Sequence, residues 1–365
     1  MTTRVIQWGV GNVGHHALRG VLERPDLELV GLRVFNPAKV GVDAGEMFDR
    51  PPVGVVGTDN VDELMALDAD VVLYNALGTT LWDLQGTVDE LCMLLASGKN
   101  VISSAIDLFL YIKPGVAPAH VKPEMVRQIE NACIAGGASV YSTGMTPGFA
   151  LDLWPMTMAR VVRRVDSIHV KELISLRNYA SVMHEFMGFG LRPGDEIAMF
   201  KMFEESPENP AAGALNTPYG AAIHFVGDAF GVKIDKITYQ HIDFQTAKER
   251  LILPSGTFEP GQIVGVQFRL SGWVRGDEFF RIDLDWRVDD AGWTPNLCAW
   301  ELEIKGDPSV KSRMEFATET DARRATSITV ASHCLNAIPK VVEAPPGILN
   351  HFNMPIFTSQ ASASW

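Results

Sequence analysis

The segment Gly9-Val10-Gly11-Asn12-Val13-Gly14 has the glycine spacing of a phosphate-binding turn. Gly9 permits a tight turn, Gly11 lets the backbone approach a pyrophosphate, and Gly14 lets a helix pack close to a sheet. An apolar run precedes the turn and helical spacing follows it, so the phosphates would meet the free N–H groups of a helix N-terminus. The motif therefore predicts a dinucleotide site, and the alternative is a glycine-rich turn without a ligand. The expected cofactor contacts are Gly9, Gly11, Asn12, Val13 and Gly14.

The residues after the second apolar run bear on which dinucleotide is preferred. An NAD site places Asp or Glu about twenty residues after the glycines, where the carboxylate binds the ribose hydroxyls. This sequence has Asn36 and Lys39 there, and the nearest acid is Asp43. A carboxylate would repel the 2′-phosphate of NADP, whereas Asn36 would not and Lys39 would attract it. We expect NADP, with NAD as the alternative if Arg33 and Lys39 are only solvated surface charges.

The elements that must position these residues alternate along the first half of the chain. Apolar runs typical of buried parallel strands occupy 4–10, 27–35, 53–56, 70–74, 101–103 and 139–142. Helical segments are expected at 13–24, at 61–67 after a cap at Asp59 or Asn60, from Thr79 or Thr80 to 97, and at 123–135. Strands that alternate with helices predict crossover units and a parallel sheet, hence a dinucleotide-binding α/β domain at 1–150.

The pattern changes after about residue 150. A strand is expected at 167–176, and the stretch 233–304 alternates apolar and polar residues with a period of two. Such alternation predicts antiparallel strands with one buried face. We therefore expect a second, α+β domain at 151–318, built on an open, mainly antiparallel sheet. The remaining expectations are a mobile loop at 205–218, a helix at 321–338, and a C-terminal segment at 319–365 that packs on the first domain.

Composition and charge argue against several classes of partner. The net charge is −13, from 31 Lys and Arg against 44 Asp and Glu, which disfavours nucleic acid and an anionic membrane. We find no apolar run long enough to span a membrane and no signal-peptide pattern. The four cysteines are far apart and form no Cys-x-x-Cys pair, so no metal site and no disulfide scaffold is predicted. Scattered thiols are typical of a reducing cytoplasm, where we expect the protein.

Five segments together resemble one protein family. They are Gly9–Gly14, Phe35–Gly45, Gly98–Ser104, Gly144–Phe149 and Asn336–Pro339. The sequence resembles the dihydrodipicolinate reductase-like proteins, above all the branch of 2,4-diaminopentanoate dehydrogenase and the native amine dehydrogenases, over nearly the whole chain. The resemblance implies an α/β fold with an N-terminal Rossmann-type parallel sheet, an inserted α+β domain and a C-terminal helix returning to the first domain. It also implies a nicotinamide cofactor and a homodimer built on the sheet of the second domain.

The resemblance also implies which strand ends meet the ligands. It places residues 75–80 and Ser103-Ser104 beside the cofactor, and the segment 144–149 under the nicotinamide end. The sequence agrees, because each segment follows a predicted strand, where open α/β sheets bind ligands. The alternative for each is an ordinary strand-to-helix turn. The expected cofactor residues here are Asn75, Ala76, Thr79, Ser103 and Ser104, and the expected substrate-pocket residues are Tyr141, Thr146, Pro147 and Tyr179.

The catalytic acid is where this sequence departs from the family. The related amine dehydrogenases carry a glutamate that faces the substrate nitrogen, where this chain has Ala105-Ile106-Asp107-Leu108. Asp107 could hold an ammonium or relay a proton, or it could be a helix cap. His184 and Glu185 are further candidates because the pKa of histidine lies near neutrality, although a lone helical histidine is more often structural.

We interpret the chain as an NAD(P)H-dependent oxidoreductase, above all an amine dehydrogenase or imine-reducing enzyme acting on a small carbonyl or amine substrate. One alternative is an NADP-dependent alcohol or ketone oxidoreductase, although the Tyr-x-x-x-Lys spacing of the short-chain enzymes is missing after Tyr141 and Tyr179. The other alternative is a nucleotide-binding regulator without turnover. Consumption of NADPH with ketones plus ammonia would distinguish these hypotheses.

Overall fold

The computed structural model describes residues 2–76, 83–106, 110–112, 121–179, 183–204, 218–317 and 325–359. The chain divides into two compact units. Unit 1 comprises Met1–Leu110, Val121–Met145 and Ser327–Trp365, and unit 2 comprises Tyr111–His120 and Thr146–Thr326. The chain thus enters the main part of unit 2 at Thr146 and leaves it after Thr326, where the sequence analysis placed the domain boundaries after 150 and 318.

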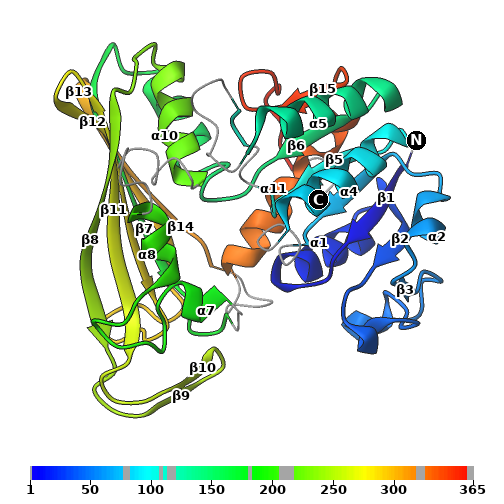
Figure 1. Cartoon of the computed structure of the whole chain (residues 1–365), viewed down its shortest axis with the longest axis horizontal. Coiled ribbons are helices and arrows are strands. Elements are labelled where there is room, and N and C mark those ends of the chain that lie inside the picture. The colour runs from blue at the N-terminus through cyan, green and yellow to red at the C-terminus, as the bar shows by residue number, and fades with distance from the viewer. Residues whose placement is uncertain are drawn as a thin grey trace. The chain divides into compact units, whose positions relative to one another are not determined.

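Unit 1 is built on a seven-stranded parallel sheet with the strand order β15-β6-β5-β4-β1-β2-β3 (Figure 1). The strands are β1 (Thr3–Trp8), β2 (Leu27–Arg33), β3 (Gly57–Thr58), β4 (Val71–Tyr74), β5 (Asn100–Ser103), β6 (Ser139–Ser142) and β15 (Gly347–Leu349). The helices are α1 (Asn12–Glu23), α2 (Val61–Met65), α4 (Leu84–Ala96), α5 (Pro123–Gly136) and α11 (Ala325–Val342). Every neighbouring pair of strands is parallel, so their carboxyl ends share one edge.

The parallel sheet is buried because its strands are continuous apolar runs. Val5 and Ile102 of the strands share one core with Ala17 of α1 and with Cys334 and Ile338 of α11. Helices α4 and α5 lie side by side in the same unit (Figure 1). Strand β15 pairs with β6, so the prediction that the C-terminal segment returns to the first domain is confirmed.

Unit 2 contains a six-stranded sheet with the order β14-β13-β7-β12-β11-β8, in which only the β7–β12 pair is parallel (Figure 1). Its strands are β7 (Arg164–Ser175), β8 (Lys236–Thr246), β11 (Ile263–Val274), β12 (Asp277–Arg287), β13 (Cys298–Asp307) and β14 (Val310–Glu315). A separate hairpin pairs β9 (Leu251–Leu253) with β10 (Gly256–Phe258). The helices are α6 (Leu153–Ala159), α7 (Met183–Phe186), α8 (Ala198–Glu204) and α10 (Pro218–Ala229). The predicted open, mainly antiparallel sheet is confirmed.

One face of this second sheet is apolar and the other is charged. In β12 the side chains of Phe280 and Ile282 are fully buried. At the alternate positions, Arg281 forms an ion pair with Glu278, and Asp283 forms one with Arg269. This is the predicted alternation with a period of two. Helix α10 covers part of the apolar face, because a Cβ added at Gly272 of β11 would lie 2.4 Å from the Ile223 side chain. The two faces of the sheet are therefore chemically distinct.

Several element boundaries differ from the sequence-based ones. The strand expected at 53–56 is wrong: β3 lies at Gly57–Thr58, and the Val53 and Val56 side chains are about half exposed. The reason is the Asp43 carboxylate, which accepts the N–H groups of Gly45, Val53 and Gly54 and so folds this stretch into a loop. Of the two predicted caps of α2, Asp59 and Asn60, the structure shows Asn60.

Other differences concern where helices begin and end. Helix α4 begins at Leu84, and its cap is Asp83, whose side chain accepts the Gly86 N–H at 2.8 Å. Helix α11 continues past residue 338 to Val342. Thr79, Thr80, residues 205–217 of the expected loop and residues 321–324 of the expected helix lie outside the described residues. Within the part of the chain that the structure describes, no helix is long and apolar enough to cross a membrane.

Candidate active site

The glycine loop joins β1 to α1 and has the geometry that a pyrophosphate requires. Gly9 has φ +94°, and a Cβ at Gly14 would lie 2.1 Å from the Gly9 carbonyl oxygen, so neither position tolerates a side chain. At Gly11 an added Cβ would meet nothing within 4 Å. Gly11 is the N-cap of α1 and has no side chain that could occupy the helix N–H groups. Open space and the N-terminus of a helix coincide there, so the loop fits a dinucleotide.

A buried glutamine holds this loop against the neighbouring strand end. The Gln7 side chain has no exposed surface, and its Nε2 donates to the Gly9 carbonyl at 2.8 Å and to Asn75 Oδ1 at 2.9 Å. The Asn75 amide donates in turn to Ser104 Oγ at 2.8 Å. The polar network therefore links the ends of β1, β4 and β5. Sequence analysis missed Gln7, although a polar residue inside the apolar run of β1 was a visible signal.

The other predicted residues at this edge take different positions. Ser103 Oγ donates to the Tyr74 carbonyl at 2.8 Å and accepts the Ala105 N–H at 2.9 Å, so it shapes the turn after β5. Ser104 is partly exposed, and Ala76 is buried. Asn12 and Val13 open the first turn of α1 and are partly exposed. Of these strand-end residues, Ser104 presents a hydroxyl at the edge.

The end of β2 brings a cation to the glycine loop. Lys39 Nζ donates to the Val10 carbonyl at 2.8 Å, although the two residues lie 29 apart in the sequence. Asn36 Oδ1 accepts the Ala38 N–H at 3.0 Å and caps the short turn that carries Lys39. The Arg33 guanidinium lies over the Phe35 ring, 4.7 Å from its centroid. The carboxylate of Asp43 is occupied by its own loop, so it is not placed to bind a ribose.

Tyr141, an expected pocket residue, lies in the interior of unit 1. It is fully buried in the core of unit 1, and its hydroxyl is hydrogen-bonded to His351 Nδ1 at 2.9 Å. The next strand-end residue, Thr143, has its hydroxyl 3.0 Å from His333 Nδ1, which also lies 2.9 Å from the Gly144 carbonyl oxygen. The end of β6 is thus fixed by α11 and the C-terminal segment, which the sequence pattern did not reveal.

In unit 2, Thr146 is bound to a buried carboxylate that the sequence analysis did not consider. The Thr146 hydroxyl accepts the Trp300 Nε1–H at 2.9 Å and is hydrogen-bonded to Glu172. Pro147 is buried and follows a cis peptide bond. Burial raises the pKa of Glu172 above its usual range, while hydrogen bonds from Thr146 and from Trp286 and Trp300 act in the opposite direction.

His184 and Glu185 lie on the short helix α7 of unit 2 and differ in exposure. His184 is buried beside Tyr179 and Phe189, with ring centroids at 6.5 and 5.5 Å, and Glu185 is exposed. Burial lowers the pKa of His184, against hydrogen bonds with the backbone of Ser255 and Tyr179 that raise it. The lowered pKa favours the neutral form of the imidazole. The structure does not bring His184 and Glu185 together as one acid–base pair.

Two of the predicted site residues are not among those that the structure describes. Asp107, the expected catalytic acid, and Thr79, an expected cofactor contact, both lie outside the described residues. Within the described ranges, no group of three or more His, Cys, Asp or Glu side chains could hold a metal ion.

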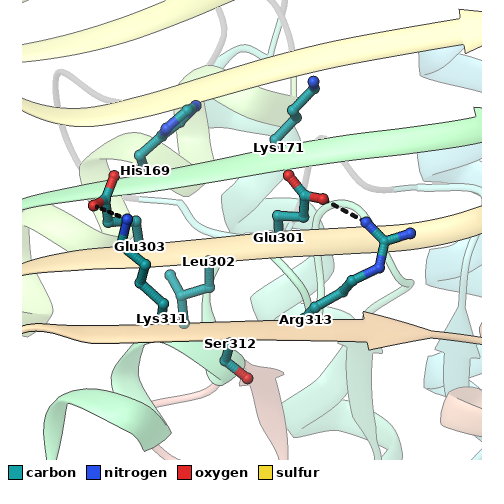
Figure 2. A pocket seen from close by; sticks show the side chains of 8 residues that line it. All are labelled: His169, Lys171, Glu301, Leu302, Glu303, Lys311, Ser312 and Arg313. Atoms are coloured by element: carbon teal, nitrogen blue, oxygen red, sulfur yellow. Dashed lines mark hydrogen bonds and ion pairs between the residues drawn. The ribbon is translucent and has the colours of Figure 1, made fainter.

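A cavity of about 510 Å³ lies on the charged face of the second sheet (Figure 2). Its walls carry paired charges: Lys311 bonds Glu303, and Arg313 bonds Glu301. His169 and Lys171 project from β7 on the same face. Glu172 directly follows Lys171 in the strand and so points to the opposite, apolar face. The cavity is therefore separate from the Thr146–Glu172 cluster.

Comparison with known proteins identifies the family. The model of the 2,4-diaminopentanoate dehydrogenase C-terminal domain matches residues 149–364, which is more than half of the chain. The chain belongs to this family. The prediction made from the sequence segments is thereby confirmed.

Relatives of this family match over nearly their full length. An amine dehydrogenase of Streptomyces virginiae is 28% identical, with 96% of this chain and 96% of the relative covered. A 2,4-diaminopentanoate dehydrogenase of Acetoanaerobium sticklandii is 22% identical, with 97% and 93% covered. The solved structure of an amine dehydrogenase from Mycobacterium smegmatis has a TM-score of 0.77 at 19% identity and covers 99% of this chain and 98% of its own, which shows a shared fold.

Proposed function

We propose that this protein is an NAD(P)-dependent oxidoreductase that acts on a CH–NH2 or C=N group of a small substrate, as an amine dehydrogenase. The observation that carries the proposal is a phosphate-accepting glycine loop in a chain that resembles an amine dehydrogenase and a diaminopentanoate dehydrogenase from end to end. When bound, the nicotinamide supplies hydride exchange at its C4 atom. The rest of the catalysis belongs to the residues of this chain.

Two groups of residues take part in the proposed reaction. One group would bind the cofactor, and the other would stabilise and protonate or deprotonate the substrate nitrogen. The N–H groups at Gly11 and the first turn of α1 would bind the pyrophosphate, and Asn75 and Ser104 would bind at the adjoining strand ends. Asp107 would stabilise an ammonium or iminium charge and take up or release its proton. Thr146 and Pro147 would contact the substrate. His184 would act as a neutral residue, because burial lowers its pKa.

The preferred cofactor in this proposal is NADP. Lys39 lies against the glycine loop through its bond to the Val10 carbonyl, and no carboxylate stands at the tip of β2 in the described residues. A cation at this position favours a ribose that carries a phosphate over one with two hydroxyls.

Replacing Lys39 with glutamate should weaken NADPH binding more than NADH binding. Only NADPH carries the 2′-phosphate, so the expected loss is about 1–3 kcal/mol for NADPH, the range of a lost charge-assisted bond, and much less for NADH. Isothermal titration of both cofactors measures the difference. Lys39→Gln is the matched control, because it removes the charge without adding repulsion and should give a smaller loss of the same sign. Equal losses for both cofactors would show that Lys39 does not contact the phosphate.

The amine assignment is tested by the dependence of turnover on ammonium. NADPH oxidation with a panel of small aldehydes and ketones should require ammonium, and the product should be an amine. Oxidation at the same rate without ammonium, with an alcohol as the product, would support the alcohol dehydrogenase alternative instead. The absence of turnover together with tight NADPH binding would support the regulator alternative.

The proposal includes a homodimer and a cytoplasmic location. The charged face of the second sheet offers a surface for a second copy, since acids and bases alternate along it and Asp283 and Asp285 are already largely shielded. Light scattering of the purified protein measures the oligomeric state. Four cysteines without a disulfide support a reducing compartment.

A further inference from the structure

Glu172 breaks the pattern of the strand on which it lies. The residues of β7 that face the covered side of the sheet are Ile168, Val170, Glu172 and Ile174, and all four are buried. Only 4% of the Glu172 surface is exposed. A carboxylate in an apolar row destabilises the fold unless hydrogen bonds compensate for its lost hydration. Such a residue indicates a role beyond packing.

The compensation comes from neutral donors. Trp286 Nε1 donates to Oε1 at 2.6 Å, and Trp300 Nε1 donates to Oε2 at 2.8 Å. The Thr146 hydroxyl is the third partner. Among the described residues, no Lys, Arg or His forms an ion pair with this carboxylate. Two indoles and a hydroxyl therefore fix the orientation of Glu172, and Glu172 in turn fixes theirs.

Thr146 is bound from two sides. The Trp300 N–H is shared between Glu172 Oε2 and Thr146 Oγ1, at 2.8 and 2.9 Å, and the Thr146 hydroxyl also bonds the carboxylate. The following backbone is held as well, because the Gly148 N–H donates to the fully buried Asp152 at 2.8 Å. The segment 146–149 is thus anchored through both a side chain and the main chain.

This segment follows β6 at the carboxyl edge of the parallel sheet, where the cofactor is proposed to bind. Strand β6 ends at Ser142, and Thr146 is the first residue of the long unit 2 segment. The last residue of that segment, Thr326, is bound to Cys298 Sγ at 3.3 Å, two positions before Trp300 on β13. Strand β13 therefore anchors the chain at both crossings, and Glu172 lies directly across from Trp300 in the neighbouring strand.

We propose that Glu172 is a positioning residue for the reaction: together with Trp300 it holds Thr146 and thereby fixes the substrate-facing segment 146–149. This inference rests on the proposed function for the role of the segment, and on the hydrogen bonds above for its mechanism. Glu172 does not touch substrate in this account. Its effect reaches the reaction through the Thr146 side chain and the backbone that follows it.

Paired substitutions test the proposal. Glu172→Gln puts an amide N–H₂ against an indole N–H, so one contact is lost, and Trp300→Phe removes the donor shared with Thr146. Each should lower kcat by about tenfold or more while the Kd of NADPH changes less than twofold, since misplacement of a reacting group by 1 Å carries a loss of that order. Val170→Ala is the control, because it removes volume from the same buried row and no hydrogen bond to Glu172 or Thr146. This control should keep kcat within twofold of wild type.

Hydrogen exchange separates this proposal from the proposed function. Faster exchange of the Gly148 and Phe149 amides is expected in Glu172→Gln and Trp300→Phe, and not in Val170→Ala, whether or not an amine is the substrate. If Glu172→Gln and Trp300→Phe match this control in exchange and in kcat, Glu172 is only structural and the proposal is overturned. Wild-type turnover at the same rate with and without ammonium would contradict the amine assignment and would leave the role of Glu172 unaffected.

Discussion

Gly11→Asp is expected to abolish dinucleotide binding and to leave the protein folded. The residue has φ −89° and ψ −155°, an extended conformation that any residue adopts, and the space around its Cβ position is open. The new carboxylate would stand where the pyrophosphate approaches the helix N-terminus, so steric and electrostatic terms both oppose binding. We expect the Kd of NADPH to rise by about 10²-fold or more, or roughly 3 kcal/mol. Calorimetry and thermal unfolding on one sample measure both quantities.

Two further substitutions, one at Gly11 and one at Gly14, separate loss of binding from loss of stability. Gly11→Asn has nearly the size of Asp without its charge, so the difference between the two variants isolates the electrostatic part. Gly14→Ala should behave in the opposite way and unfold the protein at lower temperature, because its Cβ would lie 2.1 Å from the Gly9 carbonyl oxygen. Undiminished NADPH affinity in Gly11→Asp would show that the loop is not the binding site.

Asp107→Asn should lower the rate of reductive amination by about 10²-fold or more, the scale of a positioned acid–base group. The substitution retains size and removes the charge that would stabilise an iminium or ammonium. It also discriminates between the two hypotheses for this residue, because Asn caps helices as well as Asp does. If Asp107 were only a cap, the variant would keep both stability and rate. The kcat of ketone plus ammonium, with NADPH affinity measured in parallel, gives the answer.

Asp83→Asn is the matched control for this prediction. Asp83 is an observed helix cap at the start of α4, so its replacement should leave both rate and stability nearly unchanged. A fully active Asp107→Asn enzyme would contradict the catalytic assignment and direct attention to His184 and Glu185.

The elements with strong local signals were predictable from the sequence. Continuous apolar runs predicted the parallel strands, and alternation with a period of two predicted the second sheet, since burial on two faces or one leaves these patterns. The strand predicted at 53–56 was wrong because the Asp43 carboxylate accepts the backbone N–H groups of Val53 and Gly54 and holds this stretch in a loop. A contact of this kind leaves no periodic pattern in the sequence. The family was also predictable, from segments spread along the chain.

The candidate site was predictable only where a single short segment contains all the residues that its function needs. The glycine loop is such a segment, and its geometry agrees with each of the expected glycine roles. Tyr141 was assigned to the pocket by position alone, but its partner His351 lies 210 residues away and places it in the core. Gln7 and Glu172 were overlooked for a related reason: each is polar within an apolar run, and its meaning depends on partners from distant strands.

The central claim is that hydride passes from the nicotinamide to a carbon that carries nitrogen. The most direct measurement is a turnover of [4-²H]NADPH, of each C4 stereochemistry, with a small ketone and ¹⁵N-ammonium, analysed by mass spectrometry and NMR. The account predicts a product amine in which deuterium, from one of the two labelled cofactors, and ¹⁵N are bound to the same carbon. Deuterium found in an alcohol, formed equally well without ammonium, would contradict it.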